Sequence, residues 1–194
     1  MTNRVLVTAA VAWIAAASWA VHAQQPGDGP RYTGDTLVRP VDYREWTFLA
    51  AGLGMTYEPE NTATQPRQLF TNVFVNPSSY RGFLQSGTWP NGTVFILEIR
   101  ASASEGSINK GGHFQAGIVG MEAHVKDSRF PDGWAFFNFG APGGALRDAA
   151  APLAPAQAAR CVECHTKNGA VERTFVQFYP TLIETAKRMG TYKQ

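Results

Sequence analysis

The sequence contains few cysteines and histidines, and neither sign of charge dominates. Its 194 residues include 2 Cys and 4 His, and 17 Lys and Arg residues stand against 15 Asp and Glu residues. A structural zinc site would need further cysteines or histidines close to these two cysteines. The near balance of charge gives no reason to expect a nucleic acid or an anionic membrane as a partner. The chain also lacks an internal repeat and, after its first 23 residues, any apolar run long enough to span a membrane.

Both cysteines lie in one late pentapeptide, Cys161-Val162-Glu163-Cys164-His165. This C-x-x-C-H pattern is typical of covalent haem c attachment, in which both thiols add to the haem vinyl groups and the His becomes the proximal iron ligand. The alternatives are a lone disulfide, half of a zinc site and a thioredoxin-like redox pair. The last is expected near a βαβ pattern, whereas this motif follows an alanine-rich run. The sequence therefore predicts one covalently attached haem c, with Cys161, Cys164 and His165 as its attachment and metal-binding residues.

The N-terminus has the pattern of a secretory signal peptide. A short basic region ends at Arg4, an apolar stretch covers residues 5–21, and Val21-His22-Ala23 resembles a cleavage site. The alternative is a membrane anchor, but the apolar stretch is short and contains Thr8 and Ser18. Cleavage after residue 23 of 194 would leave 171 residues, enough for a single domain. We therefore expect a periplasmic protein, because c-type haem is attached outside the cytoplasm.

The mature chain is predicted to begin with a flexible lead-in at residues 24–40, rich in Gly and Pro, before a single haem-binding domain at 41–194. Within the domain, β-branched and aromatic runs predict strands, while N-cap, Pro and Gly signals predict helices. The pattern indicates an α+β fold, mainly an antiparallel sheet with flanking helices, in which a C-terminal helix holds the haem. Strands are expected at 70–75, 93–99, 116–126 and 134–139, a helix passing into a strand at 43–49, and helices at 77–84, 156–165 and 182–189.

Three expectations concern single positions in these elements. Alternation along 116–126 places Glu122 and His124 on one face, which meets either water or a pocket, and we expect His124 at the surface or in a dimer contact. The strand at 134–139 is apolar on both faces and is expected to be central. Met189 follows the haem motif but is expected to pack in the core, which leaves the sixth position of the iron open.

Several stretches spread along the mature domain occur together, in a fixed order, with the late haem motif. They are Tyr43-Arg44-Glu45-Trp46, Val73-Phe74-Val75-Asn76-Pro77 with Tyr80, Gly92-Thr93-Val94, residues 120–128, Gly133-Trp134-Ala135-Phe136, the haem motif and residues 175–180. In these stretches the chain resembles cytochrome P-460 and its relative cytochrome c′-β. The resemblance spans nearly the whole mature domain and implies a mostly antiparallel β fold, a homodimer and a five-coordinate haem c with His165 as the proximal ligand.

One residue departs from the pattern of hydroxylamine-oxidising family members. Those members carry a lysine that is covalently linked to the porphyrin, and here Leu97 occupies the corresponding position. Lys126 and Lys110 are not obvious replacements, so the resemblance is closer to cytochrome c′-β, which lacks the cross-link and binds nitric oxide or carbon monoxide in an apolar pocket. Glu122 matches the distal carboxylate that is thought to accept protons from the substrate, with a solvent-exposed strand residue as the alternative reading.

The distal wall of the haem is expected to come from apolar strand residues, with Phe95, Leu97 and Phe136 as cofactor contacts and Phe74 and Phe137 as further candidates. An apolar wall admits neutral diatomic molecules and excludes anions, because an anion loses more hydration than such a site replaces. We therefore expect nitric oxide binding, or redox chemistry of small nitrogen compounds with a periplasmic redox partner. The alternatives are hydroxylamine oxidation, in which Glu122 would be catalytic, and simple electron transfer.

Overall fold

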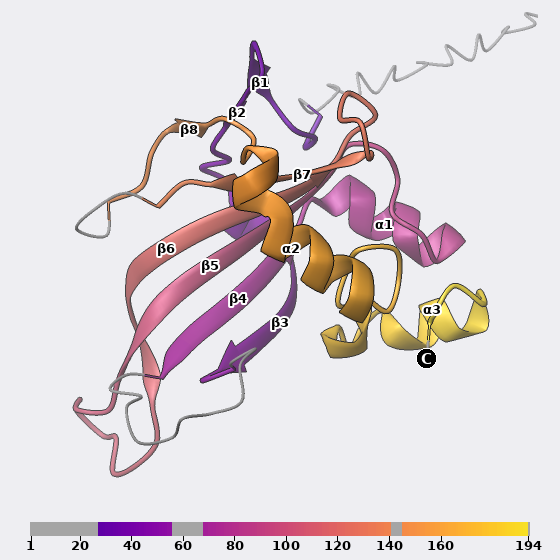
Figure 1. Ribbon diagram of the computed structural model, residues 1–194. Coiled ribbons are helices and arrows are strands. Elements are labelled where there is room, and N and C mark those ends of the chain that lie inside the picture. The colour runs from indigo at the N-terminus through magenta and orange to yellow at the C-terminus, as the bar shows by residue number, and fades with distance from the viewer. Residues whose placement is uncertain (1–26, 56–67, 141–144, 194) are drawn as a thin grey trace, which may run out of the picture.

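The computed structural model describes residues 27–55, 68–140 and 145–193. In these residues two antiparallel sheets are combined with three helices, which confirms the predicted α+β fold (Figure 1). The predicted signal peptide at 1–23 lies outside the described residues, as does the start of the predicted lead-in. None of the helices in the described ranges is long and apolar enough to cross a membrane.

The main sheet has five strands in the order β3-β4-β5-β6-β7, and each strand is antiparallel to its neighbours. Its three middle strands are the β-branched and aromatic runs that the sequence predicted at 70–75, 93–99 and 116–126. The strand bounds are β3 (Thr47–Leu53), β4 (Leu69–Val75), β5 (Thr93–Ala103), β6 (Phe114–Lys126) and β7 (Trp134–Asn138).

The strand β7 lies at the edge of the sheet, so the expectation that it would be central is wrong. Both of its faces are nevertheless covered: Phe137 belongs to a core cluster on one side, while the Phe136 ring stacks on His124 on the other. The chain beyond β7 also returns to its free edge, where Leu153 N–H donates to the Phe136 carbonyl over 2.8 Å. An edge strand therefore has the composition of a central one.

The described part of the predicted lead-in contains two short strands, which differs from the expectation of an unpacked segment. β1 (Tyr32–Thr33) and β2 (Thr36–Val38) pair with each other, and β2 pairs with β8 (Ala149–Ala150) to complete a small sheet. Leu37 is fully buried in a core cluster with residues of the main sheet. The partner strand lies more than 100 positions along the chain, so no local pattern reports this pairing.

The helices α1 (Pro77–Ser86), α2 (Pro155–Asn168) and α3 (Ile183–Arg188) confirm the three predicted helices. Each of α1 and α2 begins with a proline, and α1 ends at Gly87, whose φ of 71° is left-handed. The Asn76 side chain does not cap α1. Its Oδ1 instead accepts a hydrogen bond from Val94 N–H over 2.8 Å, which ties the start of α1 to β5.

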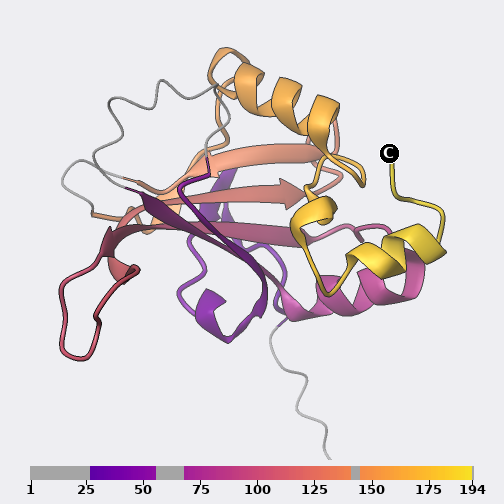
Figure 2. The same cartoon turned by 90° about the horizontal axis from the view of Figure 1, so that it is seen from below.

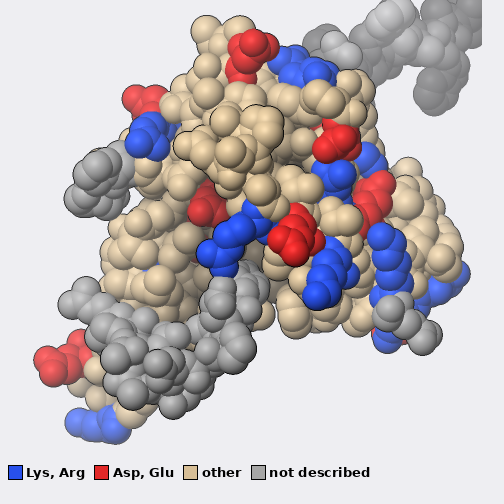
Figure 3. Space-filling view, viewed as in Figure 1, with Lys and Arg blue, Asp and Glu red and all other residues tan. Residues whose placement is uncertain are grey.

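The two faces of the main sheet are covered by different parts of the chain. In Figure 2 the helix α2 (orange) lies on one side of the sheet, and the N-terminal segment (indigo) lies on the other. Figure 3 shows Lys and Arg side chains interspersed with Asp and Glu side chains on the viewed face, in agreement with the near balance of charge. The face below α2 carries the candidate site.

Candidate functional site

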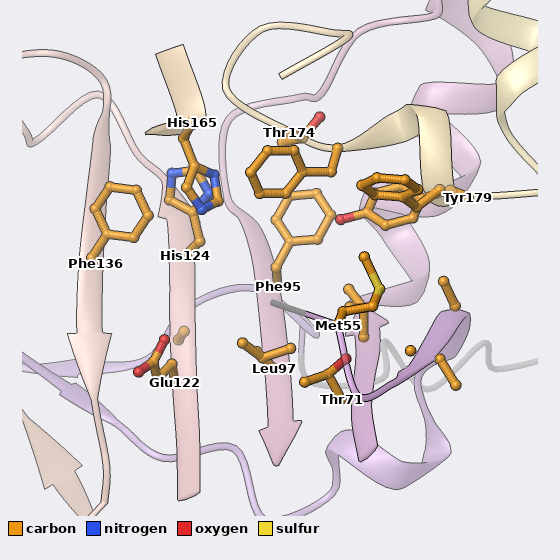
Figure 4. A pocket seen from close by; sticks show the side chains of 17 residues that line it. Met55, Thr71, Phe95, Leu97, Glu122, His124, Phe136, His165, Thr174 and Tyr179 are labelled. Atoms are coloured by element: carbon orange, nitrogen blue, oxygen red, sulfur yellow. The ribbon is translucent and has the colours of Figure 1, made fainter. Parts of the chain in front are cut away.

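A cavity of about 260 Å³ lies between the main sheet and the C-terminal part of the chain. All five strands of the sheet contribute to its lining, together with α2 and the segment that follows it (Figure 4). Apart from a few polar groups, the lining is apolar. Its residues are Ala50, Ala51, Gly52, Met55, Thr71, Val73, Phe95, Leu97, Glu122, Ala123, His124, Phe136, His165, Thr174, Phe175, Phe178 and Tyr179.

The register of the sheet explains which predicted residues meet at the cavity. Leu97 pairs directly with Glu122, and the neighbouring row pairs Phe95 with His124 and His124 with Phe136. Directly paired residues of antiparallel strands point to the same face. The structure thus brings Glu122, Phe95, Leu97 and Phe136 together, as Figure 4 shows.

Two candidates for the distal wall lie on the other face of the sheet, and that prediction is wrong for them. Phe137 is buried in the cluster beside the small sheet, and Phe74 packs against the same cluster. The Phe74 ring centroid lies 5.4 Å from that of Tyr43, in an edge-on arrangement. Both residues are core, because each is separated from a cavity residue by an odd number of positions on its strand.

The helix α2 carries the haem motif over the cavity. Cys161 and Cys164 are free thiols of intermediate exposure, and the His165 ring lines the cavity. His165 Nδ1 lies 2.8 Å from the Arg173 carbonyl, which can only accept, so Nδ1 is the donor and Nε2 remains for another partner. Burial is the main cause that lowers the pKa of His165, and it favours the neutral imidazole that binds metals.

His124 is buried, with 7% of its surface exposed, so the expectation of a surface or dimer-contact residue is wrong. Its ring stacks on Phe136 with centroids 4.1 Å apart and meets the His165 ring edge-on at 4.7 Å. Its Nε2 atom has no hydrogen-bond partner among the described residues. The alternation of residues along β6 correctly placed His124 on the same face as Glu122. Whether that face of the sheet is buried depends on the position of α2, which the sequence pattern does not give.

Glu122 lines the cavity and its side chain is exposed, in agreement with the solvent-exposed alternative, yet the surrounding protein removes part of its hydration. This desolvation raises the pKa of its carboxyl. Glu122 also raises the pKa of the nearby Cys161 thiol, although burial is the larger cause there. A carboxyl with a raised pKa beside an apolar cavity holds a proton more readily than an ordinary surface carboxyl does.

The cavity also contains residues that the sequence reasoning missed. Met55, just after β3, contributes its side chain, and Phe175 and Tyr179 close the cavity from the C-terminal side. No local pattern marks Met55, which is followed by polar sequence. Met189, in contrast, ends α3 beside Gly87 and is not part of the lining. It is 42% exposed, so the expectation that it packs in the core is wrong.

No lysine is among the described residues that line the cavity. Lys126 lies at the end of β6, where its Nζ donates to Glu172 Oε1 over 2.5 Å and to the Trp89 carbonyl over 2.7 Å. Lys110 is exposed in the connection between β5 and β6. The residues paired with Glu122 are Leu97 on β5 and Asn138 on β7.

These residues fit a covalently attached haem. Two unpaired thiols stand on α2 with an imidazole whose Nδ1 is already hydrogen-bonded, the cavity beside them is mostly apolar, and the buried Nε2 of His124 lacks a partner among the described residues. A sequence comparison agrees: the family model for cytochrome P-460 matches residues 40–176. No curated protein matches the chain.

Proposed function

Because the chain belongs to the cytochrome P-460 family and is therefore a c-type haem protein with covalently attached haem, we propose that it is a periplasmic cytochrome with one five-coordinate iron. Its proposed role is to bind small diatomic ligands such as nitric oxide, or to take part in redox chemistry of small nitrogen compounds. Bound haem supplies a redox-active iron with a coordination position for a small ligand.

Three residues of α2 are proposed to hold the haem. Cys161 and Cys164 would form the thioether bonds, and His165 would bind the iron through Nε2, since Nδ1 is engaged with the Arg173 carbonyl. The hydrogen bond from Nδ1 to the Arg173 carbonyl fixes the tautomer and the orientation of the His165 ring. The neutral state of His165, favoured by burial, is the one that ligates a metal.

The observation that carries the proposal is the apolar lining that faces the cavity beside His165. Phe95 presents its aromatic ring there, and Leu97 is paired with Glu122 at the position where, by the family resemblance, the hydroxylamine-oxidising members have a cross-linking lysine. Phe136 lies nearer the proposed iron ligand, with its ring centroid 5.0 Å from that of His165. Such a lining excludes water and anions but accepts neutral diatomic molecules. Leu97 has no amine with which to form the cross-link.

His124 has a buried, unpartnered Nε2, but its ring lies directly against the proposed iron ligand. The rings of His124 and His165 meet edge-on, with centroids 4.7 Å apart. His124 would therefore pack beside His165 in the haem-bound protein, and it is not proposed as a second iron ligand.

Two alternatives have specific support. Glu122 lines the cavity and has a raised pKa, and both support the alternative in which it would accept protons from hydroxylamine despite Leu97. The Met55 thioether in the lining favours simple electron transfer, because a thioether can complete the coordination of a haem iron.

Two further parts of the proposal concern location and assembly. The N-terminal pattern and the attachment of c-type haem outside the cytoplasm support the periplasm. A homodimer is supported by β3, an edge strand whose Phe48 is 50% exposed and whose Leu53 is 43% exposed. A periplasmic redox partner would deliver or remove the electrons.

A titration of the reduced, haem-matured protein with carbon monoxide or nitric oxide tests the proposal, with hydroxylamine turnover measured in parallel. We expect gas to bind the wild-type protein and the Met55→Leu variant alike, and hydroxylamine to be oxidised hardly at all. Binding that appears only in Met55→Leu would replace the proposal with electron transfer. Rapid hydroxylamine oxidation that is lost in Glu122→Gln would replace it with the oxidase.

A further inference from the structure

The turn Val171–Thr174 sets the orientation of His165. Thr174 N–H donates to the Val171 carbonyl over 2.9 Å, and Val171 N–H donates back to the Thr174 carbonyl over 3.3 Å. Between them, Glu172 has a φ of 52°, in the left-handed region that few residues other than Gly adopt. The next residue, Arg173, presents its carbonyl to His165 Nδ1 at 2.8 Å. The position of this turn therefore determines the hydrogen bond to the proposed iron ligand.

The buried Trp89 side chain anchors one side of the turn. Its Nε1–H donates to Thr174 Oγ1 over 2.8 Å, and the indole is only 2% exposed. Trp89 packs against Phe83 and Phe95, with ring centroids 4.2 and 4.7 Å away. The anchor thus belongs to the rigid core beside the cavity.

The ammonium of Lys126 anchors the other side. It donates to Glu172 Oε1 over 2.5 Å and to the Trp89 carbonyl over 2.7 Å, while Trp89 N–H donates to Glu172 Oε2 over 3.3 Å. The side chains of Lys126 and Glu172 are 24% and 28% exposed, so water screens this ion pair less than one on the open surface. The strained Glu172 backbone is held in place by its own carboxylate.

We infer that Lys126 and Glu172 are positioning residues for His165: their ion pair holds the turn so that the Arg173 carbonyl accepts the Nδ1 proton. This inference rests on the proposed role of His165 as the iron ligand. A hydrogen bond at Nδ1 makes the ligating nitrogen more electron-rich, and second-shell partners of this kind tune the metal. The ion pair therefore strengthens the iron–histidine bond and lowers the reduction potential.

The test compares Lys126→Met, Glu172→Gln and the double variant as haem-matured full chains. The two readouts are the iron–histidine stretching frequency of the reduced protein, from resonance Raman spectra, and the reduction potential. We expect each single variant to lower the frequency and to shift the potential to a more positive value. The double variant should shift little further than the stronger single variant, because both changes remove one interaction.

Two controls separate positioning from a general effect of charge or stability. Lys126→Arg keeps the cation and should retain nearly wild-type values. Lys187→Met removes an exposed lysine whose Nζ lies 2.9 Å from Glu184, and it should shift neither readout. If Lys126→Met does not yield folded protein, Glu172→Gln alone decides, since it conserves the shape of the side chain.

Folded variants with wild-type frequency and potential would overturn the inference while leaving the proposed iron ligand intact. Strictly additive shifts in the double variant would also overturn it. A wild-type protein without an iron–histidine stretching band would instead contradict the role of His165. The two failures are therefore distinguishable.

Discussion

Glu98 is a carboxylate buried inside the sheet, on the face opposite the cavity, and only 3% of its surface is exposed. Arg100 Nε donates to it over 2.7 Å, Asn72 Nδ2 over 3.0 Å and Arg44 Nη2 over 2.8 Å, and the Tyr43 hydroxyl donates as well. Burial alone would raise the pKa of Glu98, but the hydrogen bonds from Arg100, Tyr43 and Asn72 together lower it to about 2.

Replacement of Glu98 by Gln should destabilise the fold at neutral pH by about 2 kcal/mol, because hydrogen bonds to a charged group are lost. A carboxyl with a lowered pKa stabilises the folded state above its ordinary pKa of 4.5, and that contribution is lost as the pH falls toward 2. Urea unfolding of both proteins at pH 7 and at pH 3 measures the difference. A gap between wild type and variant that is as large at pH 3 as at pH 7 would contradict this account.

From residue identity, the chemical groups of the site could be predicted more reliably than the contacts that surround them. The positions of Glu122 and Leu97 at the cavity follow from alternation along two strands, and the C-x-x-C-H motif needs no structure to be recognised. His124 was misjudged because alternation gives the face of a strand but not what covers that face. Whether Phe95, Leu97 and Phe136 contact the haem stays a prediction.

At the scale of elements, the end of α2 must fit closely against the turn that follows it. A Cβ atom on Gly169 would lie 2.6 Å from the His165 carbonyl oxygen and 2.8 Å from the Thr174 nitrogen. Both atoms belong to the backbone, so a larger residue would displace either the helix end or the turn.

Gly169→Ala should therefore lower the free energy of unfolding by about 1–3 kcal/mol through overpacking. Gly111→Ala is the matched control, because a Cβ atom there meets nothing within 4 Å. Denaturant unfolding of both variants measures the effect. Equal free energies of unfolding for the two variants would contradict this prediction, because they would show that the turn moves to accommodate the Cβ atom without a loss of stability.

Elements with strong local signals were predicted, and those that depend on distant partners were not. The middle strands and the three helices follow from β-branched runs and helix start and stop signals. β1 and β2 are held instead by pairing with β8 and by burial of Leu37, which no local pattern reveals. β7 has the composition of a central strand because the chain before α2 covers its edge.

At the scale of the whole molecule, the site is assembled from segments spread from β3 to the residues that follow α2. The sheet supplies an apolar floor with one carboxyl group, α2 supplies the thiols and the imidazole, and the turn Val171–Thr174 orients that imidazole. The family and the haem motif could be recognised from the sequence, whereas the contacts of His124, Met55 and Lys126 depend on the three-dimensional assembly.

The central claim is a five-coordinate haem c without a lysine cross-link, and the absorption spectrum of the purified, haem-matured protein tests it most directly. The account predicts a high-spin, five-coordinate spectrum with an ordinary reduced haem c Soret band that shifts when carbon monoxide or nitric oxide is added. A strongly red-shifted reduced band would contradict the claim by showing that a cross-link forms despite Leu97. A low-spin spectrum that gas does not change would contradict it by showing that the sixth position is filled.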